Sequence, residues 1–73
     1  MSVIKVIEVM ANSTESWEDA AQTAVTHAAQ TLKNIRSIYV KELTAVVEQD
    51  RITEYRITGK ISFELLGGGG PQT

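Results

Sequence analysis

Two strand-like stretches, residues 37–49 and 52–66, take up nearly half of this 73-residue chain. At about 3.4 Å per residue, each strand would be roughly 45 Å long, whereas most strands in globular proteins contain 3–10 residues. Only one helix-like stretch is available to cover them, and a helix covers a strip about 10–12 Å wide. The opposite face of the sheet must therefore contact either water or another copy of the chain.

The apolar pattern of these two stretches favours another copy of the chain. The first stretch has apolar residues on both faces, which is typical of a strand that is buried on both sides. Strict alternation places Ile38, Val40 and Val46 on one face, and Tyr39, Leu43, Ala45 and Val47 on the other. The second stretch has one apolar face, which carries Tyr55, Ile57, Ile61, Phe63 and Leu65. We therefore expect a homo-oligomer.

The remaining segments give the chain a β-α-β-β order. Residues 3–10 form a short β-branched stretch that predicts a strand. A helix is expected from about residue 14 to residue 33 or 34, with Ser13 as its N-cap and a buried stripe that is mostly Ala. Residues 48–51 form the turn of a hairpin. The predicted fold is an α+β protomer, a three-stranded antiparallel sheet wrapped on one helix, and the sequence leaves open which hairpin strand lies beside the first strand.

The chain is long enough for one domain, over residues 1–66, and residues 67–73 (GGGGPQT) predict a flexible tail. A domain of this size buries only about 60% of its unfolded surface, so it usually needs an additional source of stability. The absence of Cys excludes disulfides and thiolate metal sites, which makes oligomerisation the expected source.

Composition and motifs exclude several classes of function. The net charge of −2 gives no general attraction to nucleic acid or to anionic lipid. Residues 1–10 are too short and too charged for a signal peptide, and no apolar run reaches the length of a membrane span, so we expect a cytoplasmic protein. Because the chain has no Ser-His-acid set, HExxH, P-loop or GxGxxG motif, we expect that it is not an enzyme.

Four segments of the chain resemble the dodecin family. They are VIKVIEVMANS at the start, SWEDAAQTAVTHAAQTL on the expected helix, IYVKEL on the second strand and ITEYRITGKISFEL on the third. Together they cover about residues 3–66. The resemblance implies a β-α-β-β protomer, a hollow homododecamer and a non-enzymatic role in binding, storing or buffering a small ligand, most often a flavin.

The positions that match the family's flavin pocket carry different residues here. Ser37 stands where flavin-binding dodecins have the Trp that stacks on the isoalloxazine ring, and Arg56 stands where a Gln contacts the ring edge. Thr44 and Glu64 replace Arg, and Glu64 would repel a phosphate. Loss of the aromatic platform removes about 1 kcal/mol of stacking per ring face, so we expect impaired flavin binding. The missing Trp, together with Trp17 at the helix start, is similar to the calcium-dodecin branch of the family.

The acidic start of the expected helix suggests a metal site. Glu15, Glu18 and Asp19 would supply hard oxygen ligands to Ca²⁺, which takes six to eight of them, if several copies contribute together. The same residues also suit the positive end of the helix dipole without any metal, and this simpler interpretation stays open. Trp17 is expected to pack in the core rather than stack on a ligand, and the lone His27 to lie on the helix surface.

Three functions remain open at this point. The first is a small-ligand cage with impaired flavin binding and Ca²⁺ as a candidate ligand. The alternative on the same fold is a flavin-binding dodecin that stores or buffers FMN or riboflavin in a diverged pocket. The third is a structural module of lower oligomeric order, which a small mass on gel filtration would identify.

Overall fold

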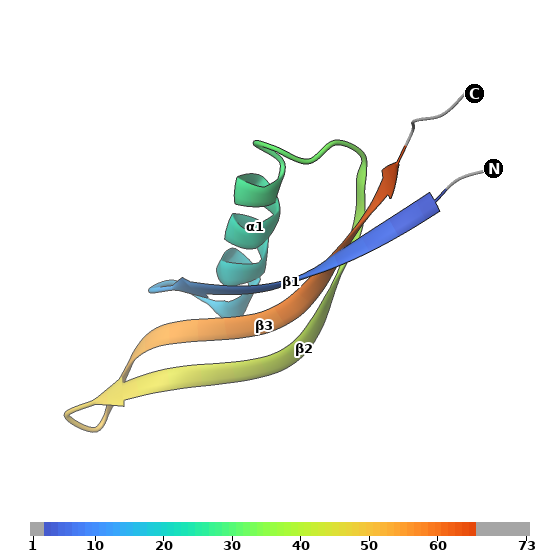
Figure 1. Ribbon diagram of the computed structural model, residues 1–73. Helices are drawn as coiled ribbons and strands as arrows, with labels where there is room; N and C mark the ends of the chain where they lie inside the picture. Colours follow the sequence, from blue (N-terminus) through green and yellow to red (C-terminus); the bar gives the residue numbers. More distant parts are fainter. Residues whose placement is uncertain (1–2, 66–73) are drawn as a thin grey trace.

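A computed structural model describes residues 3–65 and contains β1 (Val3–Ser13), α1 (Trp17–Ala28), β2 (Ile35–Glu48) and β3 (Arg51–Leu65). The sheet has the strand order β1-β3-β2, and both neighbouring pairs are antiparallel. The helix lies against one face of the sheet, and β2 and β3 continue past it as a hairpin (Figure 1). The predicted β-α-β-β fold is confirmed, and β1 lies beside β3. Leu66 and the predicted tail, residues 67–73, lie outside the described residues.

The helix begins about three residues later than the sequence predicted. Its N-cap is Ser16 rather than Ser13, because the Ser16 hydroxyl accepts a hydrogen bond from the Asp19 N–H at 2.9 Å. Ser13 instead ends β1, where it lies opposite Tyr55 of β3. Pairing with β3 thus holds the chain extended for three residues past the predicted end of the first strand, and the first helical turn is displaced downstream.

The helix also ends earlier than predicted, at Ala28 rather than near residue 33. The N–H groups of Gln30 and Thr31 bond carbonyls three residues back, at 3.1 Å each, which tightens the chain into turns. Asn34, with φ of 60°, then adopts the left-handed conformation that Asn tolerates better than most residues, and β2 begins directly after it. Among residues 3–65 no helix is long and apolar enough to cross a membrane.

The turn between β2 and β3 contains two residues, Gln49 and Asp50, and is tighter than the predicted turn over residues 48–51. Their φ angles are 52° and 64°. Positive φ at both central positions is the signature of a type I′ turn, whose twist matches that of the flanking strands. Neither residue is Gly, so both hold a conformation that Gly adopts at lower cost.

A register shift in the middle of β2 reverses part of the predicted alternation. Lys41 has no direct partner on β3, because pairing resumes one residue later. Ile38 therefore lies opposite Ile61, and Leu43 lies opposite Ile57, which places both β2 residues on the face that the helix covers. The prediction that Ile38 and Leu43 occupy opposite faces is wrong for this reason. Because of the shift, three residues lie on the face opposite to the predicted one: Leu43, Ala45 and Val46.

The core is small and lies between α1 and the middle of β3. Its fully buried large side chains are Ile57 and Ile61, which pack with Ala20 and Ala24 of the helix. Because the Ala side chain is short, the helix lies close to the sheet. Phe63 is 8% exposed and continues the buried row of β3. The predicted apolar face is therefore buried at Ile57, Ile61 and Phe63, whereas Leu65 is 44% exposed.

Gly59 lies where β2 and β3 approach each other closely. A Cβ atom at this position would be 2.4 Å from the carbonyl oxygen of Tyr39, a backbone atom of β2. Such a distance is far inside van der Waals contact, so only Gly fits without a backbone shift. The close approach occurs beside the register shift, between the two buried isoleucines of β3.

The β2–β3 hairpin extends beyond the end of β1. The β1–β3 ladder stops at the pair Ser13–Tyr55, so residues 46–54, here called the hairpin end, have no β1 partner. Within it Val47 and Ile52 are cross-strand partners that are 61% and 51% exposed. This projection contributes to a radius of gyration of 15.3 Å, compared with roughly 11 Å for a compact chain of this length.

Candidate functional site

Ser37 lies on the sheet face that points away from the helix. Its partner on β3 is Ser62, and the two hydroxyl oxygens are 2.6 Å apart, a hydrogen-bond distance. Because Ile61 and Phe63 face the helix, Ser62 faces the other way. The row presents small hydroxyl side chains and, at the predicted flavin position itself, no aromatic ring.

The next row on the same face is polar and includes an aromatic side chain. Glu8, Lys60 and Tyr39 lie opposite one another across β1, β3 and β2. Glu8 accepts a hydrogen bond from the Lys41 ammonium at 3.3 Å. Tyr39 is 63% exposed and lies two residues after Ser37 on β2. It therefore presents an aromatic ring on the same face, one row away from Ser37.

Glu64, which the sequence analysis expected to repel a phosphate, is paired with a cation. Arg36 of β2 donates through Nε to Glu64 Oε1 at 3.0 Å, and its Nη2 contacts the same oxygen. The Glu64 side chain is 17% exposed, whereas the Arg36 side chain is 58% exposed. Arg36, one residue before Ser37 along β2, thus compensates the Glu64 carboxylate in that part of the sheet.

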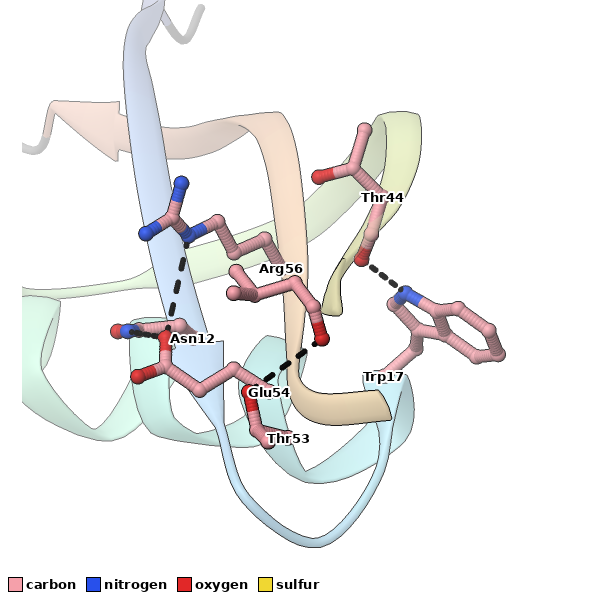
Figure 2. A network of polar contacts seen from close by, with 7 residues as sticks. Asn12, Trp17, Thr44, Thr53, Glu54 and Arg56 are labelled. Carbon is pink, nitrogen blue, oxygen red and sulfur yellow. Dashed lines mark hydrogen bonds and ion pairs between the residues drawn. The ribbon is translucent and has the colours of Figure 1, made fainter. Parts of the chain in front are cut away.

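Arg56 lies on the same face as Ser37 but at a distance from it. Its Nε is 3.9 Å from Glu54 Oε1, and that oxygen also accepts a hydrogen bond from Asn12 Nδ2 at 2.7 Å (Figure 2). Arg56 lies six positions from Ser62 along β3, which corresponds to about 20 Å along a strand. One chain therefore does not bring Ser37 and Arg56 into a single site.

Trp17 packs at the start of the helix, as predicted. Its ring meets Tyr55 edge to face, with 4.9 Å between the ring centroids and 75° between the ring planes. Its Nε1–H donates to the carbonyl oxygen of Thr44 at 2.8 Å (Figure 2). The side chain also packs against the core of the domain, so it ties the helix to both strands of the hairpin.

The acidic residues at the helix start do not form a metal site within one chain. Glu15 precedes the helix, and Glu18 and Asp19 lie in its first turn. The Asp19 carboxylate accepts a hydrogen bond from the Ser13 hydroxyl at 2.6 Å, and the same hydroxyl accepts from the Glu15 N–H at 2.9 Å. No three His, Asp or Glu side chains of residues 3–65 gather closely enough to hold a metal ion. A site on these carboxylates would need more than one copy of the chain.

The sequence analysis missed three residues that pair with the positions it had selected: Asn12, Arg36 and Ser62. Each becomes a partner only through strand register, which the sequence pattern does not specify. The clean alternation of β3 was the available signal, because it places Ser62 on the same face as Arg56. His27 is exposed on the helix, as predicted.

Comparison with protein families adds an independent observation. A family model described as Dodecin matches residues 3–66. The chain is 38% identical over 65 residues to calcium dodecin of Mycobacterium tuberculosis, which covers 89% of this chain and 92% of that protein. It is 30% identical over 63 residues to dodecin of Thermus thermophilus, covering 86% of this chain and 91% of that protein.

Solved structures agree with the fold. The crystal structure of calcium dodecin from M. tuberculosis, reported with a novel calcium-binding site, has a TM-score of 0.76 and 36% identity, with 89% of this chain and 93% of that chain covered. A variant of the T. thermophilus dodecin has a TM-score of 0.85 and 29% identity, with 90% and 98% covered. Both the sheet order and the single helix are thus features that this chain shares with structures of known proteins.

Proposed function

Because this chain belongs to the dodecin family, we propose that it is a non-enzymatic protein that binds and stores a small ligand as a hollow homododecamer. In this proposal Ca²⁺ is a ligand and flavin binding is impaired. The observation that carries it is the 38% identity to calcium dodecin across 92% of that protein's length.

Assembly is supported by the distribution of apolar residues. The chain buries few large side chains, and many others of residues 3–65 are exposed. They occur on all three strands: Val3, Ile4, Val6, Met10, Tyr39, Val40, Leu43, Val47, Ile52 and Leu65. A surface with this much exposed apolar area is typical of protein–protein contact, and copies of the same chain are the partner that the family implies.

Impaired flavin binding is supported by the chemistry around Ser37. The Ser37 and Ser62 hydroxyls share one hydrogen bond, so a ligand would have to compete with this contact. Without a ring at this position, a flavin loses about 1 kcal/mol of stacking per face. Arg56, the other predicted pocket position, lies about 20 Å along the sheet and would reach a shared ligand only from another copy.

A flavin-binding dodecin with a diverged pocket is the second candidate, and Tyr39 is the observation that favours it. Tyr39 is exposed on the same face as Ser37, and its ring would offer a substitute platform. The 30% identity to the T. thermophilus dodecin is compatible with this alternative. Flavin quenching by the wild type that disappears in Tyr39→Ala would favour it over the first candidate.

Calcium would be held by carboxylates from several copies, with Glu15, Glu18 and Asp19 as the proposed ligands. Oxygen donors suit Ca²⁺ or Mg²⁺ rather than Zn²⁺, which prefers His or Cys. The positive end of the helix dipole opposes a cation here, so several carboxylates must act together to outweigh it. Asp19 would also have to keep or exchange its hydrogen bond with Ser13.

Native mass spectrometry tests the assembly and the ligand in one measurement. We expect a mass of twelve copies without bound flavin, and added calcium that binds to wild type but more weakly to Glu18→Gln combined with Asp19→Asn. A monomer or dimer at micromolar concentration would contradict the assembly. Sub-micromolar quenching of FMN or riboflavin fluorescence would contradict impaired flavin binding, and equal calcium affinity in both proteins would move the metal site elsewhere.

A further inference from the structure

We draw no further inference here: the strongest candidate, the row formed by Tyr39 of β2 and Lys60 of β3 on the sheet face that points away from the helix, belongs to the ligand site already described, since Tyr39 lies only two residues after Ser37.

Discussion

The part of the sheet under the helix and the hairpin end are built from the same two strands, yet they bury very different amounts of apolar surface. Under the helix, Ile57 and Ile61 are 1% and 0% exposed. At the hairpin end of the same strand, Ile52 is 51% exposed. Strand-forming residues are present in both regions, so the difference comes from what lies beside them. The first region has the helix and β1 beside it, whereas the second has neither.

Replacing an isoleucine in each region should show the largest contrast. Ile61→Ala empties a fully buried position and should lower the free energy of unfolding by about 3–4 kcal/mol. Ile52→Ala removes a side chain that its own chain leaves half exposed, so it should act mainly on assembly. Urea unfolding and native mass, at one protein concentration, measure both effects. Equal losses of stability in the two variants would contradict the contrast.

Gly59→Ala should produce the next largest effect. The added methyl group would overlap the Tyr39 carbonyl oxygen at 2.4 Å, and backbone must move to accommodate it. We expect a loss of about 2–3 kcal/mol in the free energy of unfolding. Lys60→Ala, one residue further along the strand and exposed, is the control and should change stability by no more than about 0.5 kcal/mol. A Gly59→Ala variant as stable as the wild type would show that the strands can separate freely.

Trp17→Phe addresses the boundary between the two regions. Phe retains a ring beside Tyr55 but loses the donor that bonds the Thr44 carbonyl at 2.8 Å. We expect a loss of about 1 kcal/mol, since that carbonyl can turn partly to water. Thermal unfolding followed by circular dichroism measures it, with Trp17→Leu as a control that removes the ring as well. If both variants lose the same stability, the ring contact contributes nothing.

The turn of the hairpin offers the smallest effect, and it is a stabilising one. Gln49→Asn with Asp50→Gly installs residues that adopt positive φ at low cost in a type I′ turn. Relief of these two conformations should raise the free energy of unfolding by about 0.5–1 kcal/mol. Chemical unfolding measures the gain. A loss of stability would indicate that the native side chains make contacts in the assembly that this substitution removes.

The sequence was a good guide to the elements and a poor guide to their register. The two long strands, the single helix and the buried face of β3 followed from hydrophobic periodicity. The helix N-cap was assigned to Ser13, but the β1–β3 ladder keeps Ser13 in the strand and Ser16 caps the helix. The faces of β2 were misassigned past Lys41, because a register shift leaves no signature in composition.

The candidate site was harder to predict for the same reason. Ser37 could be named as a position, but its partner Ser62 and the Arg36–Glu64 pair depend on how β2 aligns with β3. The distance between Ser37 and Arg56 also depends on that alignment. Sequence resemblance identified which residues to examine, and the strand pairing decided which of them lie together.

The order in which the strands are synthesised has a consequence for how the chain folds. The central strand of the sheet, β3, is the last element of the described chain to leave the ribosome, and β1 and β2 pair with it but not with each other. A nascent chain that ends before residue 51 therefore lacks the strand with which both β1 and β2 pair. Once β3 emerges, β2 closes on it through a two-residue turn, and β1 joins across a far longer loop, which favours hairpin first and N-terminal strand last. Pulse-labelled hydrogen exchange during refolding should accordingly protect β2 amides before those of β1, and until that second step the apolar side chains of β1 lack their place in the sheet.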